Sequence, residues 1–232
     1  MTPRLHTLAA PLCLLALLTG CTRAPRGHLE QMHVQPNATE TIVLVRHGEK
    51  PLQEAHGQLD CQGLNRALAL PSVLGRYGKP DAIYAANPAA QTAEGNITPW
   101  AARYSYVRPL ATIEPYAVQL NMPVDAQIAA TDIHGLEREL LQPKYANSLI
   151  VVAWEHLEAR RFAESMLQTF NETKTVVPHW LNTDYDTVYV FRLHADAQGL
   201  RHLQFSTEQE NLDHRLPLTC PTAPLTDTPQ PH

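Results

Sequence analysis

Three consecutive residues, Arg46, His47 and Gly48, have side chains suited to holding and attacking a phosphate group. Arginine presents a planar fork of donors that matches phosphate oxygens. The imidazole of histidine has an ordinary pKa of about 6.5, so near neutral pH it offers a nitrogen lone pair as a nucleophile. Glycine has no Cβ, which lets the backbone approach a ligand closely. The triplet therefore predicts a phosphate site that contains a nucleophile.

The elements that must position these side chains are two hydrophobic strands. Residues 41–45 form an apolar run rich in β-branched side chains, which predicts a buried strand of a parallel sheet directly before Arg46. A second such run, residues 148–154, ends at Glu155 and His156, where a helix is predicted to begin. Ligands of open α/β sheets lie beyond the carboxyl ends of the strands. The two strand ends therefore predict that Arg46, His47 and His156 converge.

The sequence Arg-His-Gly-Glu at residues 46–49, after a hydrophobic strand, resembles the histidine phosphatase superfamily, also called phosphoglycerate-mutase-like. The resemblance implies an α/β three-layer sandwich with a mostly parallel central sheet flanked by helices, and an antiparallel edge strand near the C-terminus. It implies that His47 becomes a phosphohistidine and that Arg46 and His156 bind the phosphoryl oxygens. No cofactor and no metal are expected, because cationic side chains neutralise the phosphate.

The second phosphate-binding arginine of this family normally follows a serine–proline turn after the second strand. Here the strand predicted at 81–85 is followed by Asn87-Pro88, with no arginine at the usual distance. Residues 108–115 resemble the family segment Arg-x-x-x-Thr-Ala-Glu-Pro, after an insertion at about 89–107. We therefore predict that Arg108 binds phosphate. One alternative is that Arg103 binds the phosphate instead. The other is that Arg108 is a solvent-exposed residue at the start of a helix.

The general acid is harder to place, because the branches of the family differ in this residue. Glu155 is the first candidate, since it lies beside His156, and Asp132 is the second. Glu49 is expected to order the loop after the nucleophile. Lys50 either contacts the substrate or faces solvent.

The remaining chain alternates between helical and strand patterns. A helix is predicted from 63 to 77, with Pro71 kinking or dividing it. A second helix is expected over 133–141, and strands at 187–193 and 202–206 are expected to pair in antiparallel fashion. The polar and aromatic loop 178–186 either lines the pocket or lies on the surface.

The first residues are typical of a targeting segment. A basic start precedes an apolar run, residues 8–18, which is too short to span a bilayer, since that needs about 20 residues. The Leu-Thr-Gly-Cys sequence ending at Cys21 resembles a bacterial lipoprotein box, with an ordinary signal peptide as the alternative. We therefore predict a signal peptide (1–20), lipidation of Cys21, a tether (21–40), one domain (41–220) and a flexible tail (221–232). The expected location is a periplasm-facing bacterial membrane, with the outer membrane favoured by Thr22.

Charge and cysteine content narrow the function further. The formal net charge of −5 comes without a basic stripe, which argues against nucleic acid as a partner. Cys61 and Cys220 remain after the leader and the anchor are set aside, and in an oxidising compartment they are predicted to form a disulfide. Two buried thiols are the alternative.

These observations predict an enzyme, a metal-independent phosphatase that hydrolyses a small phosphate monoester through a phosphohistidine on His47. The expected partners are the phosphorylated substrate and, through the lipid anchor, a membrane. The alternative is a non-catalytic envelope lipoprotein that binds an anion on the same fold, and the altered turn at Asn87 favours this second reading.

Overall fold

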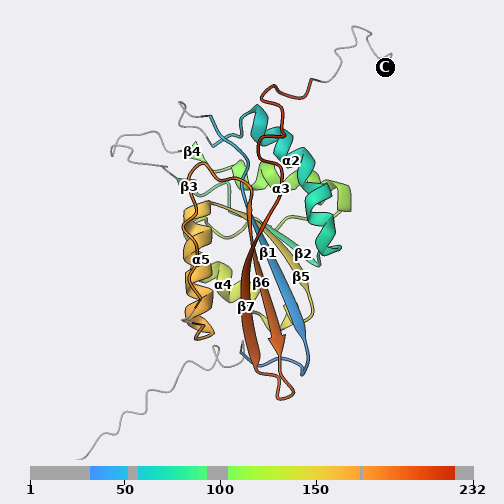
Figure 1. The fold of residues 1–232 in the computed structure, drawn as a ribbon, viewed down its shortest axis with the longest axis vertical. Helices are drawn as coiled ribbons and strands as arrows, with labels where there is room; N and C mark the ends of the chain where they lie inside the picture. Colours follow the sequence, from blue (N-terminus) through green and yellow to red (C-terminus); the bar gives the residue numbers. More distant parts are fainter. Residues whose placement is uncertain (1–31, 52–56, 93–103, 173–174, 223–232) are drawn as a thin grey trace, which may run out of the picture.

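A five-stranded mixed sheet in the order β2-β5-β1-β6-β7 forms the centre of the molecule (Figure 1). The structure is a computed structural model, and it describes residues 32–51, 57–92, 104–172 and 175–222. The strands are β1 (Thr39–Arg46), β2 (Ala82–Ala85), β5 (Leu149–Trp154), β6 (Thr187–Ala195) and β7 (Arg201–Gln209).

The sheet has a parallel half and an antiparallel half. Strand β5 pairs in parallel with both β1 and β2, while β6 runs antiparallel to β1 and to the edge strand β7. Residues 42–45 of β1 and 150–154 of β5 are apolar and buried because both faces of the sheet are covered here. The predicted parallel centre and the antiparallel edge near the C-terminus are confirmed.

Two helices cover each face of this sheet (Figure 1). Alternate residues of β1 point to opposite faces: Val43 and Val45 pack in one core cluster, Ile42 and Leu44 in the other. The first cluster includes side chains of α2 (Cys61–Leu74) and α3 (Arg108–Leu120), and the second those of α4 (Ile133–Leu140) and α5 (His156–Thr169). The three-layer arrangement is therefore confirmed.

Helix α2 differs from its prediction at both ends. It begins at Cys61, because the carboxylate of Asp60 caps it by accepting the N–H of Gly63 at 2.8 Å. It continues through Pro71 to Leu74, and a separate 3-10 turn (Gly75–Tyr77) follows. Proline removes a single donor from the helix, and the buried apolar face of α2 holds the remaining turns together.

Short elements complete the described chain. They are a small hairpin of β3 (Gln91–Thr92) and β4 (Tyr104–Ser105), and a 3-10 turn at Pro143–Tyr145. Among the residues that the structure describes, none of the helices combines the length and the apolar character that a membrane span needs.

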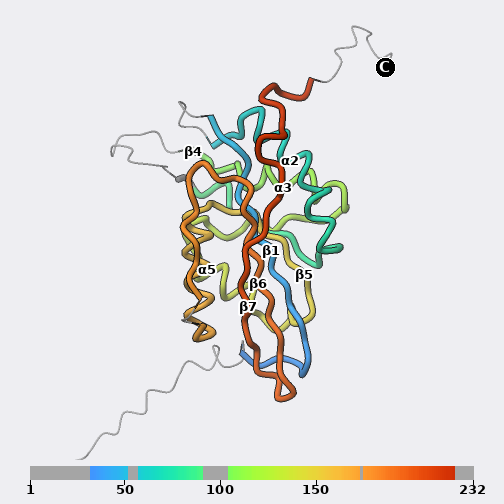
Figure 2. The backbone as a smooth tube through the Cα atoms, in the orientation of Figure 1, coloured from blue at the N-terminus to red at the C-terminus, as the bar shows by residue number. Residues whose placement is uncertain are grey.

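The segment after β7 runs back along α2 (Figure 2). Cys220 is disulfide-bonded to Cys61, with their Cα atoms 4.4 Å apart, and Asn65 donates to two backbone carbonyls of this segment. At the other end of the chain, His33 forms a β-bridge with Leu200, so this part of the predicted tether contacts the sheet. The predicted signal peptide, Cys21 and residues 223–232 of the predicted tail lie outside the described residues.

Candidate active site

The two predicted histidines follow neighbouring strands. His47 comes directly after β1 and His156 is the first residue of α5, two positions after the end of β5. Arg46 lies opposite Trp154 in the parallel register, and the backbone N–H of His47 donates to the carbonyl of Trp154 at 3.0 Å. The parallel pairing therefore brings the two chain segments side by side at the carboxyl edge of the sheet, where this class of sheet binds ligands.

His47 is fully buried, and its surroundings keep the imidazole neutral. Burial lowers the pKa of His47 well below its ordinary value, and the positive charges of Arg46 and Arg108 lower it further. Its Nδ1 lies 2.7 Å from the carbonyl oxygen of Gly48. A carbonyl can only accept, so Nδ1 carries the proton and the lone pair is on Nε2. His47 is thus held in the tautomer that a nucleophile at Nε2 needs.

Arg46 is buried and held from one side by a loop. Its Nη1 donates to the carbonyls of Leu181, Asn182 and Asp184, at 3.2, 3.0 and 2.6 Å. The guanidinium carbon lies 3.8 Å from the centre of the Tyr185 ring, a cation–π contact. Its Nε has no hydrogen-bond partner among the described residues. A buried donor without an acceptor is costly, so this edge of Arg46 is suited to an anionic ligand.

Arg108 is the first residue of α3 and is 1% exposed, which excludes the reading as a solvent-exposed residue at a helix entry. Its Nη2 donates to the hydroxyl of Tyr104 at 3.3 Å, and its guanidinium carbon lies 5.0 Å from the centre of the Tyr106 ring. The alternative arginine, Arg103, lies outside the described residues.

His156 has an oxygen atom next to each ring nitrogen. Nδ1 lies 2.5 Å from Oε1 of Glu155, and Nε2 lies 2.6 Å from Oδ1 of Asn182. These two oxygens hold the ring in place from both sides. Glu155 also caps α5, since its other carboxylate oxygen accepts the N–H of Glu158 at 2.9 Å.

Glu155 is ionised near neutral pH. Burial acts to raise the pKa of this carboxyl, but the hydrogen bond and the charge of His156 outweigh burial and leave the pKa below its ordinary value. A general acid must carry a proton, so this environment does not favour the predicted role of Glu155. Asp132, the second candidate, caps α4 by accepting the N–H of Gly135 at 2.8 Å.

Shared neighbours show that the four predicted phosphate-site residues converge. The Tyr185 ring stacks on Arg46 and has its centre 6.2 Å from that of His47. The Tyr106 ring contacts Arg108 and meets His47 edge-on at 5.8 Å. Asn182 contacts Arg46 through its carbonyl and His156 through its side chain. Arg46, His47, Arg108 and His156 thus surround one small region.

A search of solved structures supports the architecture. A protein described as the phosphohistidine phosphatase SixA from Nakamurella multipartitia superposes with a TM-score of 0.50 at 13% sequence identity, covering 75% of this chain and 98% of that chain. The chain has the histidine phosphatase fold. No protein-family model and no curated protein sequence matches it, so sequence comparison adds nothing to this assignment.

Two further structures of lower similarity carry no weight here. Mycobacterial glucosyl-3-phosphoglycerate phosphatase has a TM-score of 0.46 at 13% identity, over 72% of this chain and 97% of that one. A phosphoserine phosphatase from Entamoeba histolytica has a TM-score of 0.44 at 13% identity, over 76% of this chain and 99% of that one.

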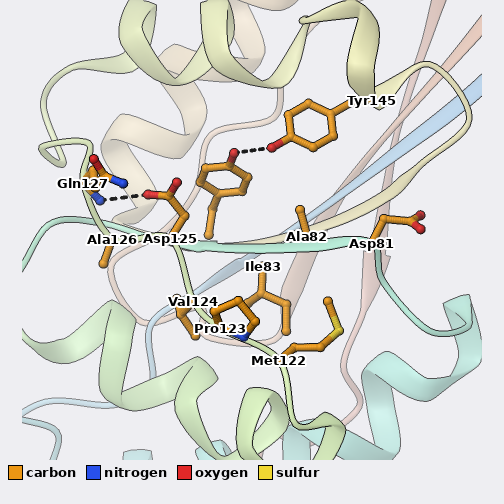
Figure 3. A pocket seen from close by; sticks show the side chains of 11 residues that line it. Asp81, Ala82, Ile83, Met122, Pro123, Val124, Asp125, Ala126, Gln127 and Tyr145 are labelled. Carbon is orange, nitrogen blue, oxygen red and sulfur yellow. Dashed lines mark hydrogen bonds between the residues drawn. The ribbon is translucent and has the colours of Figure 1, made fainter.

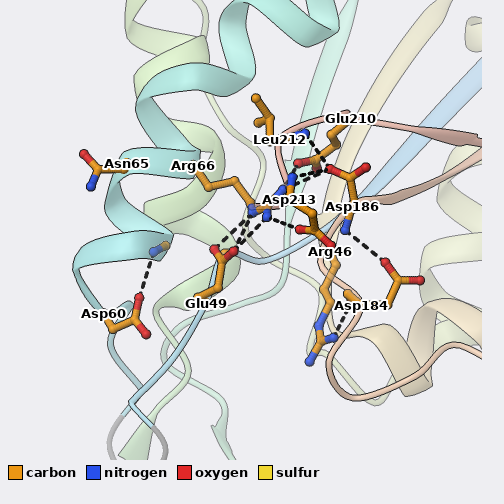
Figure 4. A network of polar contacts seen from close by, with 12 residues as sticks. Arg46, Glu49, Asp60, Asn65, Arg66, Asp184, Asp186, Glu210, Leu212 and Asp213 are labelled. Carbon is orange, nitrogen blue, oxygen red and sulfur yellow. Dashed lines mark hydrogen bonds and ion pairs between the residues drawn. The ribbon is translucent and has the colours of Figure 1, made fainter. Parts of the chain in front are cut away.

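The histidine phosphatase fold of this chain has a buried ionic network around Arg66 and Glu49 (Figure 4). Arg66 of α2 is fully buried and donates to both carboxylate oxygens of Glu49, at 2.7 to 3.2 Å. It also binds Glu210 at 2.5 Å and Asp213 at 2.6 Å, and lies 3.6 Å from Asp186. These contacts tie Glu49, two positions after His47, to α2.

Two cavities lie near this part of the fold. One of about 270 Å³ is lined by Glu49 and Lys50, by the start of α2, and by residues 182–185 and 213–214. A larger one of about 470 Å³ lies beside β2 (Figure 3) and is lined by residues 81–84 and 122–127 and by Tyr145. The smaller cavity, not the larger one, shares residues with the surroundings of His47. The described residues hold no group of three or more His, Cys, Asp or Glu side chains arranged to bind a metal ion.

Sequence reasoning missed three contributors to the site: Tyr106, Asn182 and Tyr185. Tyr106 belongs to the predicted insertion. Asn182 and Tyr185 belong to the loop 178–186, which was predicted either to line the pocket or to lie on the surface. The one signal for this loop was its aromatic and polar composition directly before a strand. Arg66 was also missed, because a charged residue on a predicted helix is ordinarily on the solvated face.

Proposed function

We propose that this chain is a phosphatase that hydrolyses a small phosphate monoester through a phosphohistidine on His47. The observation that carries the proposal is the neutral imidazole of His47, with its lone pair on Nε2, buried beside two guanidinium groups. The spare donor of Arg46 adds a position for a phosphoryl oxygen. A binding protein for anions gains nothing from a neutral ring at its centre, whereas a nucleophile requires one.

In the first step, Nε2 of His47 attacks phosphorus in line with the ester oxygen. The N–P bond forms while the P–O bond to the leaving group breaks, and the leaving oxygen takes up a proton from solvent water. Arg46 and Arg108 donate to the equatorial oxygens, on which the charge of the transition state is spread, and His156 joins them when its Nε2 turns from Asn182 to the phosphoryl group. Because the two guanidinium groups are buried and already oriented, they need little reorganisation during the reaction.

In the second step, water attacks the phosphohistidine. The N–P bond breaks, inorganic phosphate leaves, and His47 regains its neutral ring with Nδ1–H on the carbonyl of Gly48. We assign Glu155 to orienting His156, because its lowered pKa leaves it without a proton to donate. An aryl phosphate has a good leaving group that needs no proton donor, so it is the first substrate to test.

The test is hydrolysis of 4-nitrophenyl phosphate by the full chain, combined with trapping of the intermediate. Denaturing quench of a reaction with a labelled phosphate ester should leave acid-labile label on the protein. His47→Ala should abolish both turnover and label, while His134→Ala, which removes an imidazole that is 72% exposed, should change neither. Label or turnover that persists in His47→Ala refutes the proposal. Phosphate binding without turnover by the native chain identifies the non-catalytic alternative.

We also propose that the chain is a lipoprotein anchored through Cys21 to a periplasm-facing bacterial membrane, the outer membrane being favoured. The support is the leader and the Leu-Thr-Gly-Cys sequence ending at Cys21. Cys21→Ser should move the protein from the membrane fraction to the soluble fraction and prevent incorporation of labelled fatty acid. Unchanged fractionation of this variant contradicts the anchor.

A further inference from the structure

The cavity of about 270 Å³ beside His47 is placed to receive the part of the substrate that leaves. Two of its lining residues also belong to the phosphate site: Asn182 contacts His156, and Tyr185 stacks on Arg46. Glu49 and Lys50, two and three positions after His47, form another wall. An ester whose phosphoryl group lies between Arg46 and Arg108 can therefore place its leaving group in this cavity.

The two ends of this combined site differ in charge. The phosphate end holds Arg46, Arg108 and His156. Lys50, three positions after His47, is a cation of the cavity wall. The same wall carries three carboxylates, Asp60 and Glu49 on one side and Asp213 on the other, together with His214.

Asp213 is the most exposed of the carboxyl groups that contact Arg66. Its side chain is 34% exposed, against 10% for Glu49, and one of its oxygens is held by Arg66 at 2.6 Å. Arg66 itself offsets part of the negative charge. Its other contacts include Asp186, and Glu49 and Asp60 line the same cavity, so the carboxylates around this wall outnumber the cations Arg66 and Lys50. The network thus holds Asp213 in a fixed position on a wall that favours positive charge.

We propose that this cavity binds the leaving group of the substrate and selects a phosphate monoester that carries a primary ammonium group. Such a molecule matches both ends of the site, with its phosphoryl group among the cations and its ammonium group beside Asp213. An ester with a carboxylate or a second phosphate in the same place meets like charge. This substrate class rests on the proposed phosphatase function of the same site.

The test uses three two-carbon esters that differ in one terminal group: O-phosphoethanolamine, 2-hydroxyethyl phosphate and 2-phosphoglycolate. We expect kcat/KM of the full chain to fall in that order, with the ammonium ester roughly tenfold or more above the carboxylate ester. In Asp213→Asn the ratio of ammonium to hydroxyl ester should fall roughly three- to tenfold. The intrinsic reactivity of the esters cancels in this comparison of ratios between the two proteins.

Two further variants keep the test decisive. Glu114→Gln removes one negative charge at an exposed position of α3 outside the cavity, and should keep the native ratio. Gln62→Lys adds a cation to the cavity wall without altering the contacts of Arg66, so it should lower the ratio even where Asp213→Asn is too unstable to assay.

A native preference for the carboxylate ester, or ratios that neither Asp213→Asn nor Gln62→Lys changes, overturns the inference. Turnover of 4-nitrophenyl phosphate that depends on His47, together with no preference among the three esters, overturns the substrate class and leaves the phosphatase intact. Absence of any turnover that depends on His47 overturns both. The preference should also shrink as salt is added, since the contact is partly exposed.

Discussion

Replacing Arg66 by methionine tests whether the buried network around Arg66 and Glu49 holds the active-site loop in place. The side chain is 0% exposed and donates five hydrogen bonds to Glu49, Glu210 and Asp213. Methionine keeps much of the volume but leaves the carboxyl of Glu210, which is also 0% exposed, without its cation. Removing one partner of a buried ion pair costs about 3–5 kcal/mol, so we expect this loss of unfolding free energy at pH 7.5.

The loss of unfolding free energy in Arg66→Met should depend on pH in a defined direction. Burial already raises the pKa of Glu210 to about 8, although Arg66 acts to lower it. Without Arg66 that pKa rises further. Native chain and variant then both lose stability between about pH 4.5 and pH 8, but only the variant goes on losing it above pH 8, so the loss relative to the native chain should be larger at pH 9 than at pH 7.5.

The assay is urea unfolding followed by the fluorescence of the buried Trp154 and Trp180. Arg161→Met, at a side chain that is 62% exposed, is the matched control and should change stability by about 0.5 kcal/mol or less. Arg66→Lys keeps the positive charge but not the planar fork of donors, so its loss of unfolding free energy should lie between those of Arg66→Met and Arg161→Met. A loss below about 1 kcal/mol at pH 7.5, or a smaller loss at pH 9 than at pH 7.5, refutes the reasoning.

Three more predictions follow from burial and close contact. The pKa of Glu210 is about 8 in the folded chain against an ordinary 4.5, so its contribution to stability is complete below about pH 4.5 and is lost as the pH rises through about 8. Glu210→Gln should lack this slope, and a difference in urea midpoints from the native chain that stays constant between pH 5 and 9 would contradict it. Reducing the Cys61–Cys220 disulfide should cost about 3–5 kcal/mol, seen as a lower Tm with reductant; an unchanged Tm rules this out. In Gly48→Ala the new Cβ would lie 2.7 Å from the backbone oxygen of Gly63, so α2 must shift; we expect a loss of about 10²-fold in kcat/KM, against near-native activity for Gly75→Ala, where nothing lies within 4 Å. Equal activities of the two alanine variants would refute this.

Local patterns in the sequence were enough to predict the framework. The apolar runs at 41–45 and 148–154 specify buried strands wherever they lie, because nothing but a sheet covered on both faces satisfies them. The switch from such a run to Arg46-His47-Gly48, or to Glu155-His156, marks the carboxyl end of a strand. These features depend on contacts within a few residues, which a sequence displays directly. The order of the strands in the sheet, β2-β5-β1-β6-β7, came only from the structure.

The tertiary structure decided which residues that are distant in the sequence contact one another and change one another's pKa. The partners of Arg66 include Glu210 and Asp213, 144 and 147 positions away, and no local pattern links them. The loop from Leu181 to Tyr185 became part of the site because folding places it on Arg46. Glu155 is adjacent to His156 in the sequence, yet its protonation depends on burial and on the ring it contacts. Proton affinity and ligand selectivity arise from burial and from charges that long-range packing brings together, so these were settled by the fold and not by the order of residues.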